Sequence, residues 1–175
     1  MRQGDGRTPE GFYQAEFGYD SPNWWMWIDL DHPGAQGRVG VGSAFKLCLD
    51  YPNAVDRARS ARAGAARPGS AICLHGNCVS AGCASMASRD FLPVFAFARH
   101  HDRRRAGRLQ VHVFPFRFDR PQDLAARAAA ASAATGLPAA ELRAGWRELQ
   151  QGFARFEARP RPLAVRVRGG RYVFE

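Results

Sequence analysis

The sequence predicts an α+β fold with mainly β-structure in its first part and helices in its last third. In the first half, glycine and proline recur at short intervals, and the segments between them are aromatic or β-branched, which is typical of short strands joined by turns. In the last third, an alanine-rich run precedes a stripe of large apolar residues at helical spacing. The length of 175 residues is typical of a single domain with one core.

The strands of the first half are short, and each lies between two turn signals. We expect them at 11–17, 24–30 and 45–49. Asn53 then suits the N-cap of a helix that reaches Arg62. The segment 71–75 alternates with period two, which places Cys73 and His75 on one face of a further strand.

The second half is expected to begin with a helix, a strand and a second helix, at 88–104, 109–118 and 121–134. The helix after these carries an apolar stripe that should pack on the core, formed by Leu142, Trp146, Leu149, Phe153 and Phe156. A closing strand at 163–174 should turn at Gly169-Gly170.

The chain is basic, with 25 Lys and Arg against 16 Asp and Glu, a net charge of +9. Lys46 is the only lysine, and this arginine and alanine richness indicates the codon usage of a GC-rich genome. A basic surface also attracts polyanions, but charge alone does not choose among them. The apolar stretches are far shorter than the roughly 18 residues of a membrane span, so no span is expected.

Four cysteines are too few for a disulfide scaffold at this length, and three of them cluster around His75. Cys83 follows His75 by eight positions, across a loop-like segment that leads toward a helix. A cysteine nucleophile needs a base and backbone N–H groups for the developing oxyanion, and Gly82 permits the tight turn that presents such groups. The sequence leaves open whether Cys78 pairs with Cys48, with Cys73 or with nothing.

Two other interpretations of the cluster remain. The cysteines could be buried beside a histidine satisfied by hydrogen bonds. A zinc site is the other alternative, with the ligands Cys73, His75, Cys78 and Cys83.

Several ordered motifs are more specific than this chemistry. They are GDGRTPEGFY at 4–13, DYPNAVD at 50–56, LHG at 74–76, SAGC at 80–83, VFPFR at 113–117 and GRYVF at 170–174. Together they resemble the L,D-transpeptidase catalytic domain of the YkuD type, in particular its YafK-like murein branch. The resemblance covers nearly the whole chain.

The resemblance implies a mainly β, sandwich-like catalytic core with a helix after the nucleophile. We expect this core at 1–118 and a helical C-terminal extension with a closing strand at 119–175, packed on the same domain. Family domains begin with further strands and are exported to the periplasm or cell envelope. The resemblance therefore implies that N-terminal strands and a signal peptide are missing from this chain.

The resemblance also implies roles for single residues. Cys83 matches the catalytic nucleophile and His75 the catalytic histidine, while Gly82 and Ser80 match the oxyanion and orienting positions. Substrate binding is expected from Arg7, Glu10, Gly76 and Asn77. Two departures are Ala81, where the commoner branch has histidine, and an insert at 21–42 that contains Trp24, Trp25 and Trp27.

The expected function is cysteine-dependent acyl transfer on peptidoglycan stem peptides at diaminopimelate, without a metal or other cofactor. The YafK-like resemblance favours hydrolysis of the link between murein and an outer-membrane lipoprotein, and cross-link formation is the alternative. An alternative of another class is a zinc-stabilised basic module that binds nucleic acid, a partner that the first hypothesis excludes. A third is an inactive family member.

Overall fold

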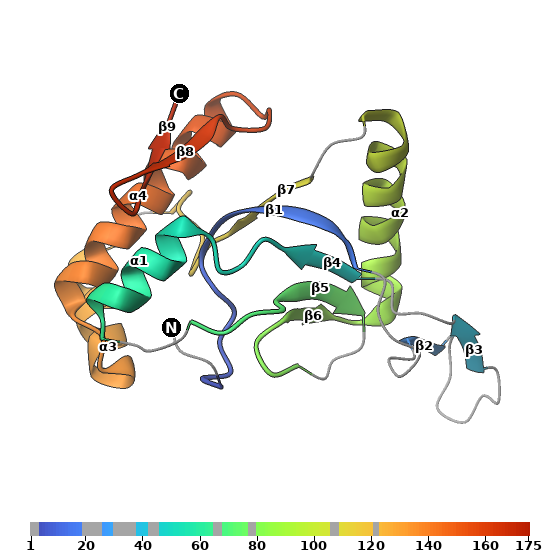
Figure 1. The fold of residues 1–175 in the computed structure, drawn as a ribbon, viewed down its shortest axis with the longest axis horizontal. Helices are drawn as coiled ribbons and strands as arrows, with labels where there is room; N and C mark the ends of the chain where they lie inside the picture. Colours follow the sequence, from blue (N-terminus) through green and yellow to red (C-terminus); the bar gives the residue numbers. More distant parts are fainter. Residues whose placement is uncertain are drawn as a thin grey trace.

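The computed structural model describes residues 4–18, 26–29, 38–41, 46–64, 68–76, 80–105, 109–120 and 123–175. Five strands form a curled mixed sheet in the order β6-β5-β4-β1-β7, with helices at both ends (Figure 1). These strands are β1 (Gly11–Gly18), β4 (Lys46–Leu49), β5 (Cys73–Gly76), β6 (Ala84–Met86) and β7 (Leu109–Val113). Neighbours pair antiparallel except β5 and β6, which are parallel. The predicted α+β fold class is confirmed.

The remaining elements are helices and two hairpins. The helices are α1 (Ala54–Arg62), α2 (Ser88–Arg105), α3 (Leu124–Thr135) and α4 (Ala139–Ala158). The hairpins pair β2 (Met26–Asp29) with β3 (Arg38–Val41) and β8 (Val165–Arg168) with β9 (Arg171–Phe174). Helices α1, α3 and α4 gather at one end of the sheet with the β8–β9 hairpin, and α2 stands at the other end (Figure 1).

Strand β1 contributes to two hydrophobic clusters because its residues alternate between the faces of the sheet. Phe12 packs into one cluster with Trp146 and Leu149 of α4. Tyr13 and Ala15 pack into the other, which includes buried residues of β4 and α2. The α4 stripe predicted from the sequence is confirmed, since Trp146 and Leu149 are buried and Leu142 and Phe153 pack against the same cluster. Phe156 contacts the ring of His112.

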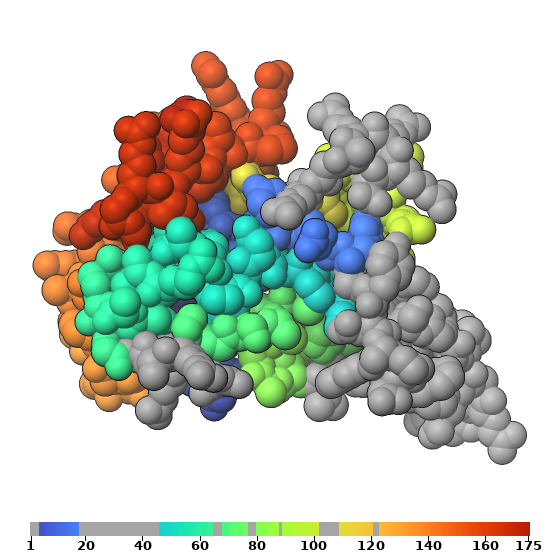
Figure 2. All heavy atoms as spheres, in the orientation of Figure 1, coloured from blue at the N-terminus to red at the C-terminus, as the bar shows by residue number. Residues whose placement is uncertain are grey.

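The C-terminal hairpin closes over α1 in the space-filling view (Figure 2). Gly170 at its turn approaches Ala58 of α1 so closely that a Cβ at position 170 would overlap the alanine side chain. Tyr172 of the same hairpin is buried, and its hydroxyl accepts hydrogen bonds from Phe12 N at 3.2 Å and Asn53 Nδ2 at 3.1 Å. The hairpin therefore ties the end of the chain to β1 and to the start of α1.

Asn53 is confirmed as the N-cap of α1. Its Oδ1 accepts from Val55 N at 2.8 Å and from Asp56 N at 3.1 Å. Asp56 Oδ2 in turn accepts from Asn53 N at 3.0 Å, which completes a capping box.

Two predicted boundaries differ from the structure by three or more residues. The strand expected at 109–118 ends at Val113, because Pro115 supplies no backbone N–H to a ladder. Helix α3 begins at Leu124, where Asp123 Oδ1 accepts from the N–H groups of the first turn, and not at Pro121, which lies outside the described residues. The helix expected after Cys83 is present as α2, and the short strand β6, which was not predicted, lies between them.

Within the described residues, no helix combines the length and the apolar character that crossing a bilayer requires.

Candidate active site

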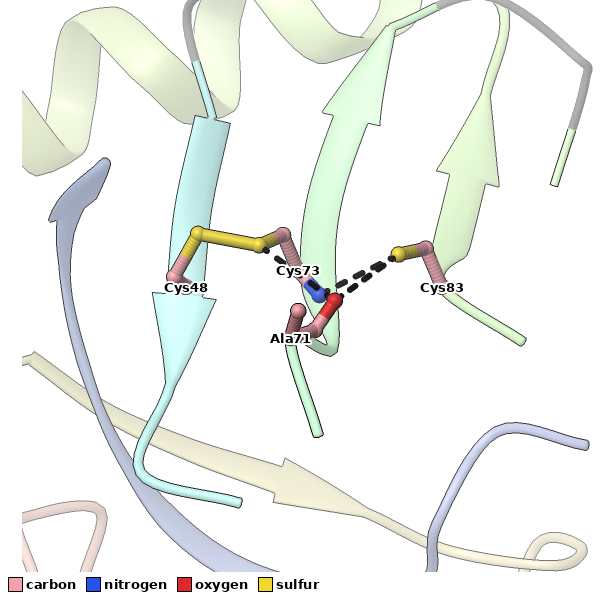
Figure 3. The surroundings of a disulfide bond; sticks show 4 residues. All are labelled: Cys48, Ala71, Cys73 and Cys83. Atoms are coloured by element: carbon pink, nitrogen blue, oxygen red, sulfur yellow. Dashed lines mark hydrogen bonds between the residues drawn. A yellow bond between two sulfur atoms is a disulfide. The ribbon is translucent and has the colours of Figure 1, made fainter. Parts of the chain in front are cut away.

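Cys83 lies at the end of a short turn, immediately before β6. It is the free cysteine of the described residues and is partly exposed. Its Sγ accepts a hydrogen bond from Cys73 N at 3.4 Å and lies 3.6 Å from the carbonyl oxygen of Ala71 (Figure 3). The thiol thus lies at the start of the edge strand β6, beside β5.

The turn before Cys83 depends on Ser80 and Gly82. Gly82 has a φ of +134°, a conformation that side chains disfavour, and a Cβ there would stand 3.2 Å from the carbonyl oxygen of Arg7. Ser80 Oγ donates to Cys83 O at 2.8 Å and accepts from Gly82 N at 3.1 Å. Ser80 therefore braces the turn itself, and the Gly82 N–H is occupied in this structure.

His75 is presented by β5 and is partly buried. Its Nδ1 lies 2.7 Å from the carbonyl oxygen of Gly76. A carbonyl only accepts, so in the neutral ring Nδ1 carries the proton and Nε2 keeps its lone pair. This arrangement suits His75 to accept a proton at Nε2, and it gives Gly76 a role in orienting the ring.

The strand register places His75 and Cys83 on neighbouring strands, but not directly opposite each other. His75 pairs with Ser85 of β6 on one side and Lys46 of β4 on the other. Leu74 pairs with Ala84, so the position beside Cys83 is Cys73. Among the described residues no hydrogen bond joins His75 to Cys83, whose sulfur is turned toward Cys73 and Ala71. Their catalytic partnership stays a prediction.

The structure pairs Cys48 with Cys73 in a disulfide between directly opposed positions of β4 and β5. This bond resolves part of the pairing that the sequence left open, while Cys78 and Asn77 lie outside the described residues. The disulfide also takes Cys73 out of the predicted set of four zinc ligands, because a metal-binding cysteine must be a thiolate. The described residues contain no group of three or more potential metal ligands.

A cavity of about 220 Å³ lies between α1 and the α3–α4 pair, and Arg7 is among the residues that line it. We call it the α1 cavity. Its polar lining includes Arg7, Glu10, Asp56, Arg59, Arg62 and Glu141, and its apolar wall includes Leu142 and Trp146. Cys83 does not line it. Arg7 connects the Cys83 turn with the α1 cavity, because its carbonyl oxygen lies near Gly82 and Arg7 also lines the cavity.

Two carboxyl groups face the α1 cavity, those of the partly buried Glu10 and the buried Asp56. Glu10 Oε2 accepts from Trp146 Nε1 at 2.7 Å, and Asp56 Oδ1 accepts from Tyr13 Oη at 3.2 Å. Burial raises the pKa of Glu10, and it raises the pKa of Asp56 to about 6, although these hydrogen bonds and the Arg59 charge act in the opposite direction. The charge of Arg59 lowers the pKa of both carboxyl groups, and Arg59 also forms an ion pair with Glu148 at 3.5 Å.

The guanidinium of Arg7 is exposed and makes no ion pair within the described part of the chain. Arg7 is therefore a cation at the cavity that can bind an anionic group of a ligand. Sequence reasoning named Arg7 and Glu10 but missed Asp56, Arg59 and Trp146. The motif at 50–56 was the available signal for Asp56, whereas nothing in the sequence places Trp146 beside Glu10.

Comparison with known proteins gives one consistent result. The chain is 28% identical over 173 residues to "Putative L,D-transpeptidase YafK" of Escherichia coli K12, and equally to the protein of that name in Escherichia coli O157:H7. The alignment covers 99% of this chain. The chain is thus similar to these YafK proteins along nearly its whole length. No family model matches it.

The chain spans 56% of the length of each YafK protein. The similarity thus extends over nearly all of this chain but reaches only part of the relatives. It supports a YafK-like L,D-transpeptidase assignment, and the motifs that carried the resemblance include the Cys83 turn, the His75 strand and the Arg7 segment.

Proposed function

We propose that this protein is an L,D-transpeptidase-family enzyme that uses Cys83 for acyl transfer on peptidoglycan stem peptides. The observation that carries the proposal is a partly exposed thiol, free among the described residues, that lies directly after a glycine of positive φ and directly before β6, the strand that pairs with the His75 strand. The likeness to YafK along the chain supports the same reading. A periplasmic or cell-envelope location goes with this substrate.

The proposed chemistry starts at a carbonyl carbon of diaminopimelate in a stem peptide. Cys83 Sγ forms a bond to this carbon, and the C–N bond to the leaving amine breaks, which leaves a thioester. His75 Nε2 takes the thiol proton and returns it to the leaving amine. Water or a second amine then attacks the thioester and releases Cys83.

For this reaction Cys83 must rotate from its present contacts toward His75. One diagonal step between neighbouring strands is on the order of 7 Å between backbones, a gap that an imidazole and a thiol can close. The Gly82 N–H becomes available to the oxyanion when its bond to Ser80 Oγ is exchanged, and an oxyanion donor is worth about 3 kcal/mol.

Arg7 and the α1 cavity are proposed to bind a charged part of the peptide. Diaminopimelate carries carboxylate and amine groups, and Arg7 is a cation that forms no ion pair with the described residues and whose carbonyl oxygen lies near Gly82 in the Cys83 turn. Arg7→Ala is expected to raise KM with a smaller change in kcat. Arg143→Ala, which removes an exposed arginine of α4 outside the cavity, is the matched control and is expected to change neither.

The water and amine outcomes can be separated with lipoprotein-linked murein as substrate. We favour hydrolysis, in which the lipoprotein leaves as the free amine and water converts the thioester to a diaminopimelate carboxylate on the murein. Cross-linked product without released lipoprotein would instead establish the transpeptidase.

The nucleophile is tested with a thiol-reactive carbapenem and intact-protein mass spectrometry. The wild-type protein and Cys78→Ser are expected to bind one carbapenem, and Cys83→Ala none. Turnover of murein by folded Cys83→Ala would remove Cys83 from its proposed role.

A further inference from the structure

Three cysteines stand in one row across β4, β5 and the start of β6. Cys48 opposes Cys73 in the β4–β5 register, and the pairing of Leu74 with Ala84 puts Cys83 beside Cys73 on the other side. Figure 3 shows the sulfur of Cys73 between those of Cys48 and Cys83. Cys73 is thus the central member of the row, with one bonded and one free neighbour.

The contacts of the free thiol place it beside Cys73, one of the two disulfide cysteines. The backbone N–H of Cys73 donates to Cys83 Sγ at 3.4 Å, so the sulfur is fixed to the very residue that carries the disulfide. The carbonyl oxygen of Ala71 lies 3.6 Å from Cys83 Sγ and 3.9 Å from Cys73 Sγ. Both sulfur atoms are therefore neighbours of one carbonyl oxygen.

The register satisfies the main geometric condition for a second disulfide. Neighbouring strands lie about 4.7–4.9 Å apart, within the Cα separations of about 4.4–6.8 Å that a disulfide spans. A Cys73–Cys83 bond therefore requires side-chain rotation but no rearrangement of the sheet. In the folded protein the reaction is intramolecular, so the thiol is presented to the disulfide at high effective concentration.

We propose that Cys83 attacks Cys73 and exchanges the Cys48–Cys73 disulfide for a Cys73–Cys83 disulfide. The Cys83 thiol first loses its proton to solvent, and the thiolate forms a bond to Cys73 Sγ. The bond between Cys73 and Cys48 breaks, and Cys48 leaves as a thiolate that takes up a proton. One disulfide and one thiol are present before and after, so no oxidant or reductant is consumed.

The exchange has a consequence that rests on the proposed function. In the exchanged form the sulfur of Cys83 is bonded to Cys73 and cannot attack a peptide carbonyl. The reverse exchange, in which Cys48 attacks Cys73, restores the free thiol. The row of cysteines would thus store the nucleophile in a protected form.

Peptide mapping distinguishes the two forms. Trypsin leaves Cys48 in the peptide 47–57, whereas Cys73 and Cys83 share the peptide 63–89. The Cys48–Cys73 bond joins two peptides, and the Cys73–Cys83 bond lies within one. Cys78 is in the same peptide, so the test uses a Cys78→Ser background.

The protein is incubated without added thiol at about pH 8.5, where an ordinary thiol is half ionised, and then quenched in acid. N-ethylmaleimide is added after denaturation, and the peptides are mapped without reduction. We expect labelled Cys48 together with a 63–89 peptide that holds an internal disulfide. In Cys78→Ser/Cys83→Ser, which lacks the attacking sulfur, Cys48 labelling should be lower by about tenfold or more. Equal Cys48 labelling in the two variants, or none in either, would overturn the proposal.

A second variant tests the geometry without the competing bond. Cys48→Ser/Cys78→Ser keeps only Cys73 and Cys83, and oxidised glutathione should convert it to the internal disulfide within the monomer. Only glutathione adducts or dimers would contradict the proposed proximity. Both experiments read the disulfide from peptide masses, so exchange can be detected even when carbapenem labelling fails. Disulfide exchange and acyl transfer by Cys83 are therefore tested independently.

Discussion

Asp56→Asn tests the electrostatics of the α1 cavity. Asp56 is only 8% exposed. Its two oxygens accept hydrogen bonds from Tyr13 Oη at 3.2 Å and Asn53 N at 3.0 Å. Burial nevertheless raises its pKa from an ordinary value of 3.8 to about 6, so the charged form is unfavourable in the folded state.

The size and sign of the effect follow from this shift. A difference of roughly two pKa units corresponds to about 3 kcal/mol between the protonated and ionised forms. Because the folded pKa is the higher one, the folded state binds the proton more tightly. This stabilising contribution of Asp56 is fully present below pH 3.8, and it is lost as the pH rises through about 6.

An asparagine at position 56 can satisfy the same neighbours without a charge. Its Oδ1 accepts from Asn53 N, and its Nδ2 donates to the Tyr13 hydroxyl oxygen. The Tyr13 hydroxyl still donates to Glu10 O, which lies 3.3 Å away. We expect Asp56→Asn to be more stable than the wild type by about 1–3 kcal/mol near pH 7, with the difference shrinking toward zero near pH 4.

Urea unfolding of the oxidised protein, followed at several pH values between about 4 and 8, measures this difference. Titration of Glu10 affects both proteins and cancels in the comparison. Asp56→Ala, which leaves the Asn53 N–H without its acceptor, should be less stable than Asp56→Asn throughout. A stability difference between Asp56→Asn and the wild type that does not change with pH would refute the reasoning.

Three further predictions concern backbone sites and the disulfide. Gly152→Ala places a Cβ against the rings of Phe12 and Phe174, the latter at 2.7 Å, and should lower Tm by roughly 4–12 °C in calorimetry, corresponding to about 2–3 kcal/mol. Gly82→Ala places an alanine at a strained φ, with its Cβ beside Arg7 O, and should lower the free energy of unfolding in urea by about 1–3 kcal/mol. The rate of carbapenem labelling should fall by more than this loss of stability accounts for. Opening the disulfide, which spans 25 residues of sequence, should lower the free energy of unfolding by about 3.5 kcal/mol, measured by urea unfolding with and without reductant.

Local patterns in the sequence predicted those parts of the fold that local chemistry determines. Asn53 at the start of α1 and the buried stripe of α4 were found because capping and helical periodicity act over a few residues. The strand β6 was missed, since Ala84–Met86 is too short to show alternation and becomes a strand only by pairing with β5.

The candidate site shows the same limit. The sequence singled out the segment from His75 to Cys83, and alternation correctly indicated that Cys73 and His75 are two residues apart on one strand. It could not reveal that Cys48 stands opposite Cys73, because a strand register depends on contacts between distant segments. The α1 cavity could not be predicted for the same reason, because the hydrogen bond between Glu10 and Trp146 joins residues that are 136 positions apart in the sequence.

Register also connects the two proposals for Cys83. The parallel β5–β6 pairing brings the thiol to the strand that carries both His75 and the disulfide. Catalysis needs the sulfur beside the imidazole, whereas its present contacts lie with Cys73 and Ala71. In the two proposals the Cys83 side chain rotates between these positions, so the two reactions compete for the same thiol. Blocking exchange with Cys48→Ser/Cys73→Ser should therefore leave Cys83 labelling by carbapenem equal to the wild type or faster, and slower labelling of the folded variant would show that the disulfide supports the nucleophile instead of competing for it.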